Sequence, residues 1–221
     1  MGPFNRPDRL RWQAASVLAA APIAALAAGD VPAPPLDAPV HASPAALVAD
    51  LHRRLLAGQS ATATLEAWCA EHGLADTPRV RAVRVRGVQR DAPVEVRSAL
   101  AINDATPLRY RRVQLTCGQR VLSEADNWYV PSLLTAAMNH ALDSSDEPFG
   151  RVVAPLDFKR QTLHDREFWP PRVDGARATV LEVRALLRDG QRRPFSYVVE
   201  NYQQEILPRQ TPAPGGTAPH R

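Results

Sequence analysis

The predicted fold is decided by the segment Leu108–Pro155, LRYRRVQLTCGQRVLSEADNWYVPSLLTAAMNHALDSSDEPFGRVVAP. Val113 and Leu115 alternate with polar residues, and this period of two is typical of a half-buried strand. A tight turn separates this strand from a second one over 121–129, and apolar spacing then predicts a short helix over 132–142. The segment therefore predicts a β-hairpin followed by a helix.

Outside this segment, helices are predicted early in the chain and strands late. Apolar spacing and capping residues indicate helices over 45–58 and 60–73. Further strands are predicted over 79–88, 94–102, 161–169, 178–187 and 194–203. Helices followed by hairpin-connected strands indicate the α+β class, here a single domain with a mainly antiparallel sheet and flanking helices.

Two charged residues are the candidates for a functional site. Arg111 falls on the same face of its strand as Val113 and Leu115, where an unpaired charge is costly to bury. Its partner is either a protein carboxylate or a bound ligand. Glu200, in the predicted strand 194–203, is the candidate for the other end of a site, unless it forms a structural ion pair with Arg111.

The two ends of the chain differ in composition from the middle. Three arginines precede an apolar run over 14–28, so residues 1–28 read as a signal peptide. The run is shorter than the apolar stretch that a membrane-spanning helix needs, and no stable span is expected after cleavage. A proline-rich linker (29–44), one domain (45–207) and a disordered tail (208–221) follow. The protein is expected in the periplasm or secreted, or in the cytoplasm if the start site is misassigned.

Composition limits the classes of function. A chain of 221 residues with net charge +4 and scattered arginines has no concentrated basic patch, so no nucleic-acid partner is expected. Its two cysteines, Cys69 and Cys117, either form a disulfide in an oxidising compartment or are two buried thiols. With only two cysteines and six histidines that have no ligand-like spacing, no metal site is expected, and the sequence contains no cofactor-binding motif. We expect a monomer.

Several short blocks occur in an order that resembles the chorismate lyase (chorismate–pyruvate lyase) family, over about 55–207. They are Ser60-Ala61-Thr62, Arg111-Arg112-Val113, Val130-Pro131, Pro148-Phe149-Gly150-Arg151 and Tyr197-Val198-Val199-Glu200. The resemblance implies a cofactor-independent lyase of ubiquinone biosynthesis, which eliminates pyruvate from chorismate or a related enolpyruvyl acid and leaves 4-hydroxybenzoate. Whether the 3- or the 4-hydroxy product forms stays open.

Family roles pass to the matching positions of this chain. By resemblance, Arg111 holds a substrate carboxylate, and the backbone at Phe149 and Gly150 meets the same group. Glu200 meets the hydroxyl end of the ring, and Thr62 belongs to the ligand-binding residues. Arg111 and Glu200 are thus the residues to which catalysis is assigned.

Some positions depart from the family pattern or leave alternatives open. Arg112 is an alternative to Arg111, although the alternation with the apolar residues favours Arg111. Ala61 replaces a larger apolar residue of the family, and the family's arginine near Asn127 is missing. Asn127 is expected to cap a strand end rather than to face a ligand. The alternative function is therefore a non-catalytic exported protein that binds a small aromatic carboxylate.

Overall fold

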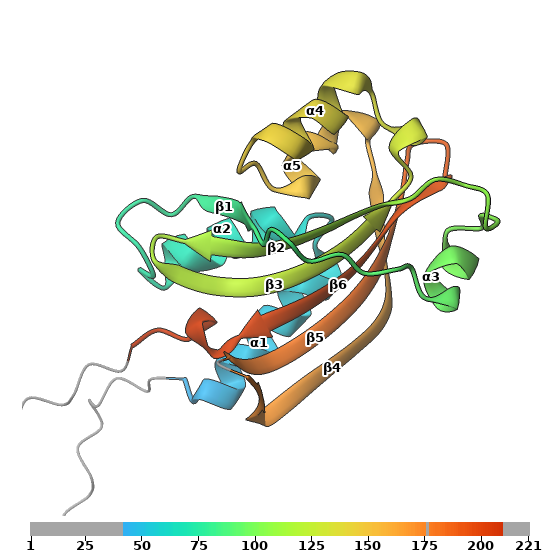
Figure 1. The fold of residues 1–221 in the computed structure, drawn as a ribbon. Coiled ribbons are helices and arrows are strands. Elements are labelled where there is room, and N and C mark those ends of the chain that lie inside the picture. Colours follow the sequence, from blue (N-terminus) through green and yellow to red (C-terminus); the bar gives the residue numbers. More distant parts are fainter. Residues whose placement is uncertain (1–41, 176, 210–221) are drawn as a thin grey trace, which may run out of the picture. The chain divides into compact units, whose positions relative to one another are not determined.

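The computed structural model describes residues 42–175 and 177–209, which fold around one antiparallel sheet of six strands in the order β1-β2-β3-β6-β5-β4 (Figure 1). The strands are β1 (Val80–Arg84), β2 (Arg109–Cys117), β3 (Arg120–Tyr129), β4 (Lys159–Asp174), β5 (Arg177–Arg188) and β6 (Pro194–Gln203). The α+β prediction is confirmed. The predicted signal peptide, nearly all of the linker and the tail beyond residue 209 lie outside the described residues.

Five α-helices accompany the sheet in the described part of the chain. They are α1 (Pro44–Ala57), α2 (Ala61–Glu71), α3 (Val94–Ala99), α4 (Ala136–Ser144) and α5 (Phe149–Val152), with 3₁₀ turns at Pro131–Leu133, Ala154–Leu156 and Gln204–Ile206. The side chains of Ser43 and Ser60 accept hydrogen bonds from the first turns of α1 and α2. Both predicted N-terminal helices therefore begin where their capping residues place them.

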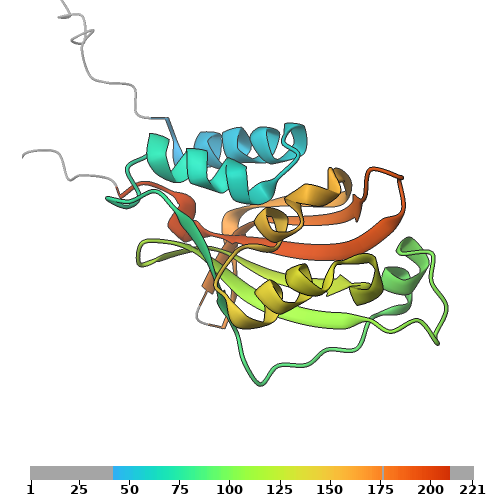
Figure 2. The ribbon, with the colours of Figure 1, turned by 90° about the horizontal axis from the view of Figure 1, so that it is seen from above.

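The helices divide between the two faces of the sheet. α1 and α2 lie side by side, and α5 lies between them and α4 (Figure 2). Leucines of α1 and α2 pack on Val113, Leu115 and Val183, whereas α4 packs beside them around Phe195 and Leu187. α3 packs on the opposite face. One face thus carries two separate apolar clusters, and the candidate site lies between them.

The prediction of a strand over 94–102 was wrong, because this segment contains α3. Val96 and Leu100 are four residues apart and pack together against Trp128, which is the spacing of one helical face. Val94, the first residue of the predicted strand, is 81% exposed. A short apolar run gives no reliable distinction between helix and strand, and here tertiary packing decides for helix.

Other boundaries shift by a few residues. The helix predicted over 132–142 begins at Ala136, where the Thr135 side chain caps it, after a 3₁₀ turn. β4 is longer than predicted at both ends. Cys69 on α2 forms a disulfide with Cys117 at the end of β2, so pairing is the alternative that the structure adopts. Among the described helices, none has the length and apolar character needed to cross a membrane.

Candidate functional site

A pocket lies between the two apolar clusters, on the face covered by α1 and α2. Its floor is formed by side chains of β2, β3 and β6, and its rim by the start of α2 and of α5. The predicted site residues that line it are Thr62, Arg111, Phe149, Gly150 and Glu200. These residues are up to 138 positions apart in the sequence and line one pocket.

Arg111 is a buried cation that has no acidic partner among the described residues. Its side chain lies on β2 and the residue is 3% exposed. Its Nη2 donates a hydrogen bond to the backbone carbonyl of Glu147 at 3.3 Å, while its Nε has no partner among the described residues. Burial lowers the pKa of Arg111 to about 10, so the guanidinium is still charged at neutral pH. An anion that enters the pocket would stabilise this buried guanidinium by supplying the missing negative charge.

Glu200 pairs with a different arginine. Arg160, at the start of β4, donates from Nη2 to Oε2 of Glu200 at 2.7 Å, and both side chains are buried. Tyr202 donates its hydroxyl proton to the same oxygen at 2.9 Å. Burial raises the pKa of Tyr202 well above its usual range, which keeps this hydroxyl protonated. The proposed Arg111–Glu200 ion pair is therefore not the one that forms.

Sequence reasoning missed Arg160. The predicted strand began one residue later, and an arginine beside Lys159 resembles a solvated strand end. One available signal was its spacing of two from Phe158, because alternate residues share a face of a strand. Both side chains line the pocket.

Two further predictions are corrected by the geometry. Arg112 lies on the opposite face of the sheet, where its Nη2 donates to Glu124 at 3.1 Å, because neighbouring residues of a strand point to opposite sides. It is therefore not a pocket residue. Asn127, expected at a strand end, is instead paired with Arg111 across β2 and β3 and lines the pocket. The Ser196 hydroxyl donates to its Oδ1 at 2.7 Å.

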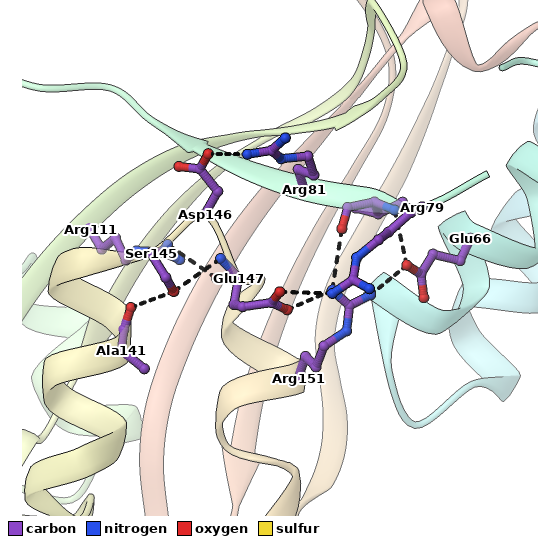
Figure 3. A network of polar contacts seen from close by, with 10 residues as sticks. Glu66, Arg79, Arg81, Arg111, Ala141, Ser145, Asp146, Glu147 and Arg151 are labelled. Atoms are coloured by element: carbon purple, nitrogen blue, oxygen red, sulfur yellow. Dashed lines mark hydrogen bonds and ion pairs between the residues drawn. The ribbon is translucent and has the colours of Figure 1, made fainter. Parts of the chain in front are cut away.

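Arg151 of the Pro-Phe-Gly-Arg block holds α5 in place (Figure 3). Its guanidinium donates to Glu147 at 2.7 Å, to Glu66 of α2 and to the backbone carbonyl of Val80 at 3.4 Å. The hydrogen bond from Arg151, helped by Arg79, holds the pKa of Glu147 below its usual value. Arg151 thus ties α5, and with it Phe149 and Gly150, to α2 and β1.

The pocket is narrow. Its cavity volume is about 60 Å³, whereas an apolar cavity of about 150 Å³ holds one benzene ring. A second hollow of about 280 Å³ adjoins it and shares Gln59, Ser60 and Phe158 with it. An aromatic ligand therefore fits only if these side chains move outward and the two spaces join.

No group of three His, Cys, Asp or Glu side chains within residues 42–175 and 177–209 is arranged to hold a metal ion. The polar groups at the pocket are instead suited to an organic anion, because guanidinium groups bind carboxylates in a bidentate manner.

Comparison with known proteins places the chain in a family. It is 39% identical over 179 residues to the uncharacterized protein y4mC of Sinorhizobium fredii (strain NBRC 101917 / NGR234), a match that covers 73% of this chain and 76% of y4mC. The chain belongs to the family of y4mC. No family model matches the sequence.

Solved structures resemble this member of the y4mC family only distantly. The effector domain of PhnF from Mycobacterium smegmatis has a TM-score of 0.46 at 9% identity, covering 66% of this chain and 88% of that one. The possible transcriptional regulator YydK from Bacillus subtilis has a TM-score of 0.44 at 16% identity, covering 62% of this chain and 63% of YydK. A ligand-binding domain of a putative GntR-family regulator from Bordetella bronchiseptica scores 0.41 at 16% identity, covering 56% and 82%. Scores of this size carry no argument about function.

Proposed function

We propose that the pocket binds a small aromatic carboxylate, with the carboxylate on Arg111 and a hydroxyl group toward Glu200. The observation that carries this proposal is the buried, charged guanidinium of Arg111, whose Nε has no partner among the described residues. A carboxylate supplies both the missing charge and acceptors for two donors. The sequence left two possible partners for Arg111, a protein carboxylate or a bound ligand, and we propose the ligand.

The lining of the rest of the pocket suits an aromatic ring, once the side chains at the rim have moved outward to admit it. Val113, Leu115, Leu187 and Val198 line it with apolar surface, and Phe149 adds an aromatic face. Apolar walls with a few polar groups that fix orientation are the usual composition of a small-molecule site. A ring between Arg111 and Glu200 places polar groups only at its two ends.

A second candidate function is the elimination of pyruvate from chorismate. It is favoured by the positions carried over from the chorismate lyase family, because Thr62, Arg111, Phe149, Gly150 and Glu200 all line this one pocket. In that reaction the ether C–O bond to the ring breaks, the ring loses a proton and becomes aromatic, and the enolpyruvyl group takes up a proton and leaves as pyruvate. The protein would orient the substrate, exclude water and offer polar groups at the breaking bond.

One experiment tests both candidates. The full chain is incubated with chorismate, and hydroxybenzoate and pyruvate are measured by chromatography; binding of 4-hydroxybenzoate is measured by calorimetry. Arg111→Met and Arg112→Met are compared, since the two arginines are neighbours on opposite faces of the sheet. Equal amounts of both products, lost only in Arg111→Met, establish the lyase. Binding without products, again lost only in Arg111→Met, establishes a binding protein. Neither binding nor products removes the proposal.

We propose further that the protein works in an oxidising compartment, the periplasm or the exterior. The Cys69–Cys117 disulfide supports this location, because such bonds persist mainly outside the cytoplasm. The signal-like composition of residues 1–28 agrees with it. N-terminal sequencing of the protein from separated cell fractions tests the proposal, and an uncleaved chain with free thiols in the cytoplasm would overturn it.

A further inference from the structure

The pocket contains three charged side chains, and two of them neutralise each other. Arg160 and Glu200 form a buried ion pair, with side chains 3% and 7% exposed. Arg111 carries a charge that no described carboxylate neutralises through an ion pair. The pocket therefore has a net charge of about one positive unit, and this unit lies at the Arg111 end.

The two carboxylate oxygens of Glu200 differ in their hydrogen bonds. Arg160 and Tyr202 both donate to Oε2, and Oε1 has no donor among the residues that the structure describes. Because an ionised carboxylate accepts hydrogen bonds and donates none, Oε1 is a fixed acceptor in the pocket wall. It suits a group that carries a proton to donate, and it repels a second anion.

We propose that Arg160 is a positioning residue that fixes Glu200 as an ionised acceptor, and that the pair makes the pocket select singly charged acids with a donor group opposite the carboxylate over dicarboxylates. This inference rests on the first proposed function, binding of a small aromatic carboxylate, because it concerns the ligand of the same pocket. It speaks against the second candidate, because chorismate carries two carboxylates. It adds a charge rule: one free guanidinium matches one carboxylate. A second carboxylate would face Oε1 of Glu200 without a cation of its own, since Arg160 is already engaged.

The proposal can be tested by changing the net charge of the pocket and measuring whether the preference between two ligands reverses. The probes are 4-carbamoylbenzoate and terephthalate, which have nearly the same size but carry one and two negative charges at neutral pH. Calorimetry with the full wild-type chain should give at least about tenfold tighter binding of 4-carbamoylbenzoate. In Glu200→Gln the net charge of the pocket rises by one, because Arg160 loses its partner. The order should then reverse in favour of terephthalate.

Two further variants keep the test informative if Glu200→Gln folds poorly. Arg160→Met/Glu200→Gln removes both charges and leaves the net charge of the pocket unchanged, so the two probes should bind with nearly equal affinity. Arg160→Met alone leaves Glu200 uncompensated and should weaken benzoate by about tenfold or more. Arg160→Lys keeps the charge and should recover most of this loss. Glu124→Gln, which removes a carboxylate paired with Arg112 on the opposite face, is the matched control and should change neither affinity.

The outcomes separate the inference from the proposed function. If wild type binds both probes equally and Arg111→Met abolishes both, the proposed function stands and the charge rule is overturned. Loss of preference in Glu124→Gln to the same extent as in Glu200→Gln also overturns it, because the effect would not be specific to the pocket. If wild type binds neither probe nor benzoate, both proposals fall together.

Discussion

Arg160 reaches Glu200 across an intervening strand: β4 carries the arginine, β6 carries the glutamate, and β5 lies between them. The curvature of the sheet and the length of the guanidinium side chain allow this contact on the pocket face. Arg111 approaches from β2, on the other side of β6 in the sheet order. The pocket is therefore bordered by two arginines from distant strands, and within residues 42–175 and 177–209 only Arg160 has a carboxylate partner.

Arg111→Met is expected to weaken ligand binding strongly and yet to stabilise the protein. Loss of the guanidinium removes a bidentate, charge-assisted contact and should weaken 4-hydroxybenzoate by about 100-fold. It also removes a buried charge without a counterion, which should raise the free energy of unfolding by about 1–3 kcal/mol. Calorimetry and urea unfolding measure the two effects. A less stable variant would contradict our account of Arg111 as an uncompensated cation.

Gly150→Ala is expected to weaken binding while the protein stays folded. A Cβ at this position would lie 3.3 Å from Ser60 Oγ and 3.6 Å from Thr62 Oγ1, at the rim of an already narrow pocket. Because the backbone of Gly150 is helical, alanine itself causes no backbone strain there. We expect a loss of about tenfold in affinity for 4-hydroxybenzoate, by calorimetry. Gly190→Ala, whose Cβ would make only ordinary contacts away from the pocket, should bind like wild type.

Arg151→Met is expected to reduce stability in a pH-dependent manner. Arg151 holds the pKa of Glu147 low, so the ionised carboxylate favours the folded state at pH values above its usual pKa of about 4.5. This contribution is lost as the pH falls through the lowered pKa of the folded state. Since Glu147 is partly exposed, loss of its interaction with Arg151 should lower the free energy of unfolding by only about 0.5–1 kcal/mol at pH 7. Urea unfolding of wild type and variant at pH 7 and pH 3 should show the difference shrinking; a constant difference would indicate that packing alone is responsible.

The sequence was sufficient to predict a mainly antiparallel sheet and the strand faces on which Arg111 and Glu200 lie. Val113 and Leu115 alternate with polar residues, and this alternation predicts which residues of β2 point to the apolar face of the sheet. It places Arg111 on the pocket face and Arg112 on the opposite face. The face of Glu200 follows in the same way from its strand. The face to which a strand residue points is a local property, and the alternation of apolar and polar residues predicts it.

The relationships that were missed depend on tertiary arrangement. Arg160 meets Glu200 across β5, so the contact depends on the order of β6, β5 and β4 in the sheet, and no local sequence pattern predicts strand order. Asn127 enters the pocket because β3 pairs with β2 in a register that sets it opposite Arg111. α3 is a helix because Val96 and Leu100 find a partner surface in Trp128. Each case needs the assembled sheet.

Reduction of the Cys69–Cys117 disulfide is expected to destabilise the domain without disturbing the pocket. The bond ties α2 to the end of β2 and closes a loop of 48 residues. In the chain-entropy account, release of a loop of this length costs about 4 kcal/mol, because the unfolded chain gains freedom. Neither cysteine lines the pocket, so affinity for 4-hydroxybenzoate should be unchanged under conditions in which the protein stays folded.

Urea unfolding of wild type with and without reductant measures this contribution, and Cys69→Ala/Cys117→Ala is the control. The double variant should have the stability of the reduced protein, apart from the small packing loss of two sulfur atoms, and should not respond to reductant. If wild type and double variant unfold at the same urea concentration under oxidising conditions, the bond contributes nothing to stability. Such a result would also remove the structural support for an oxidising compartment, since that support depends on a bond that the fold uses.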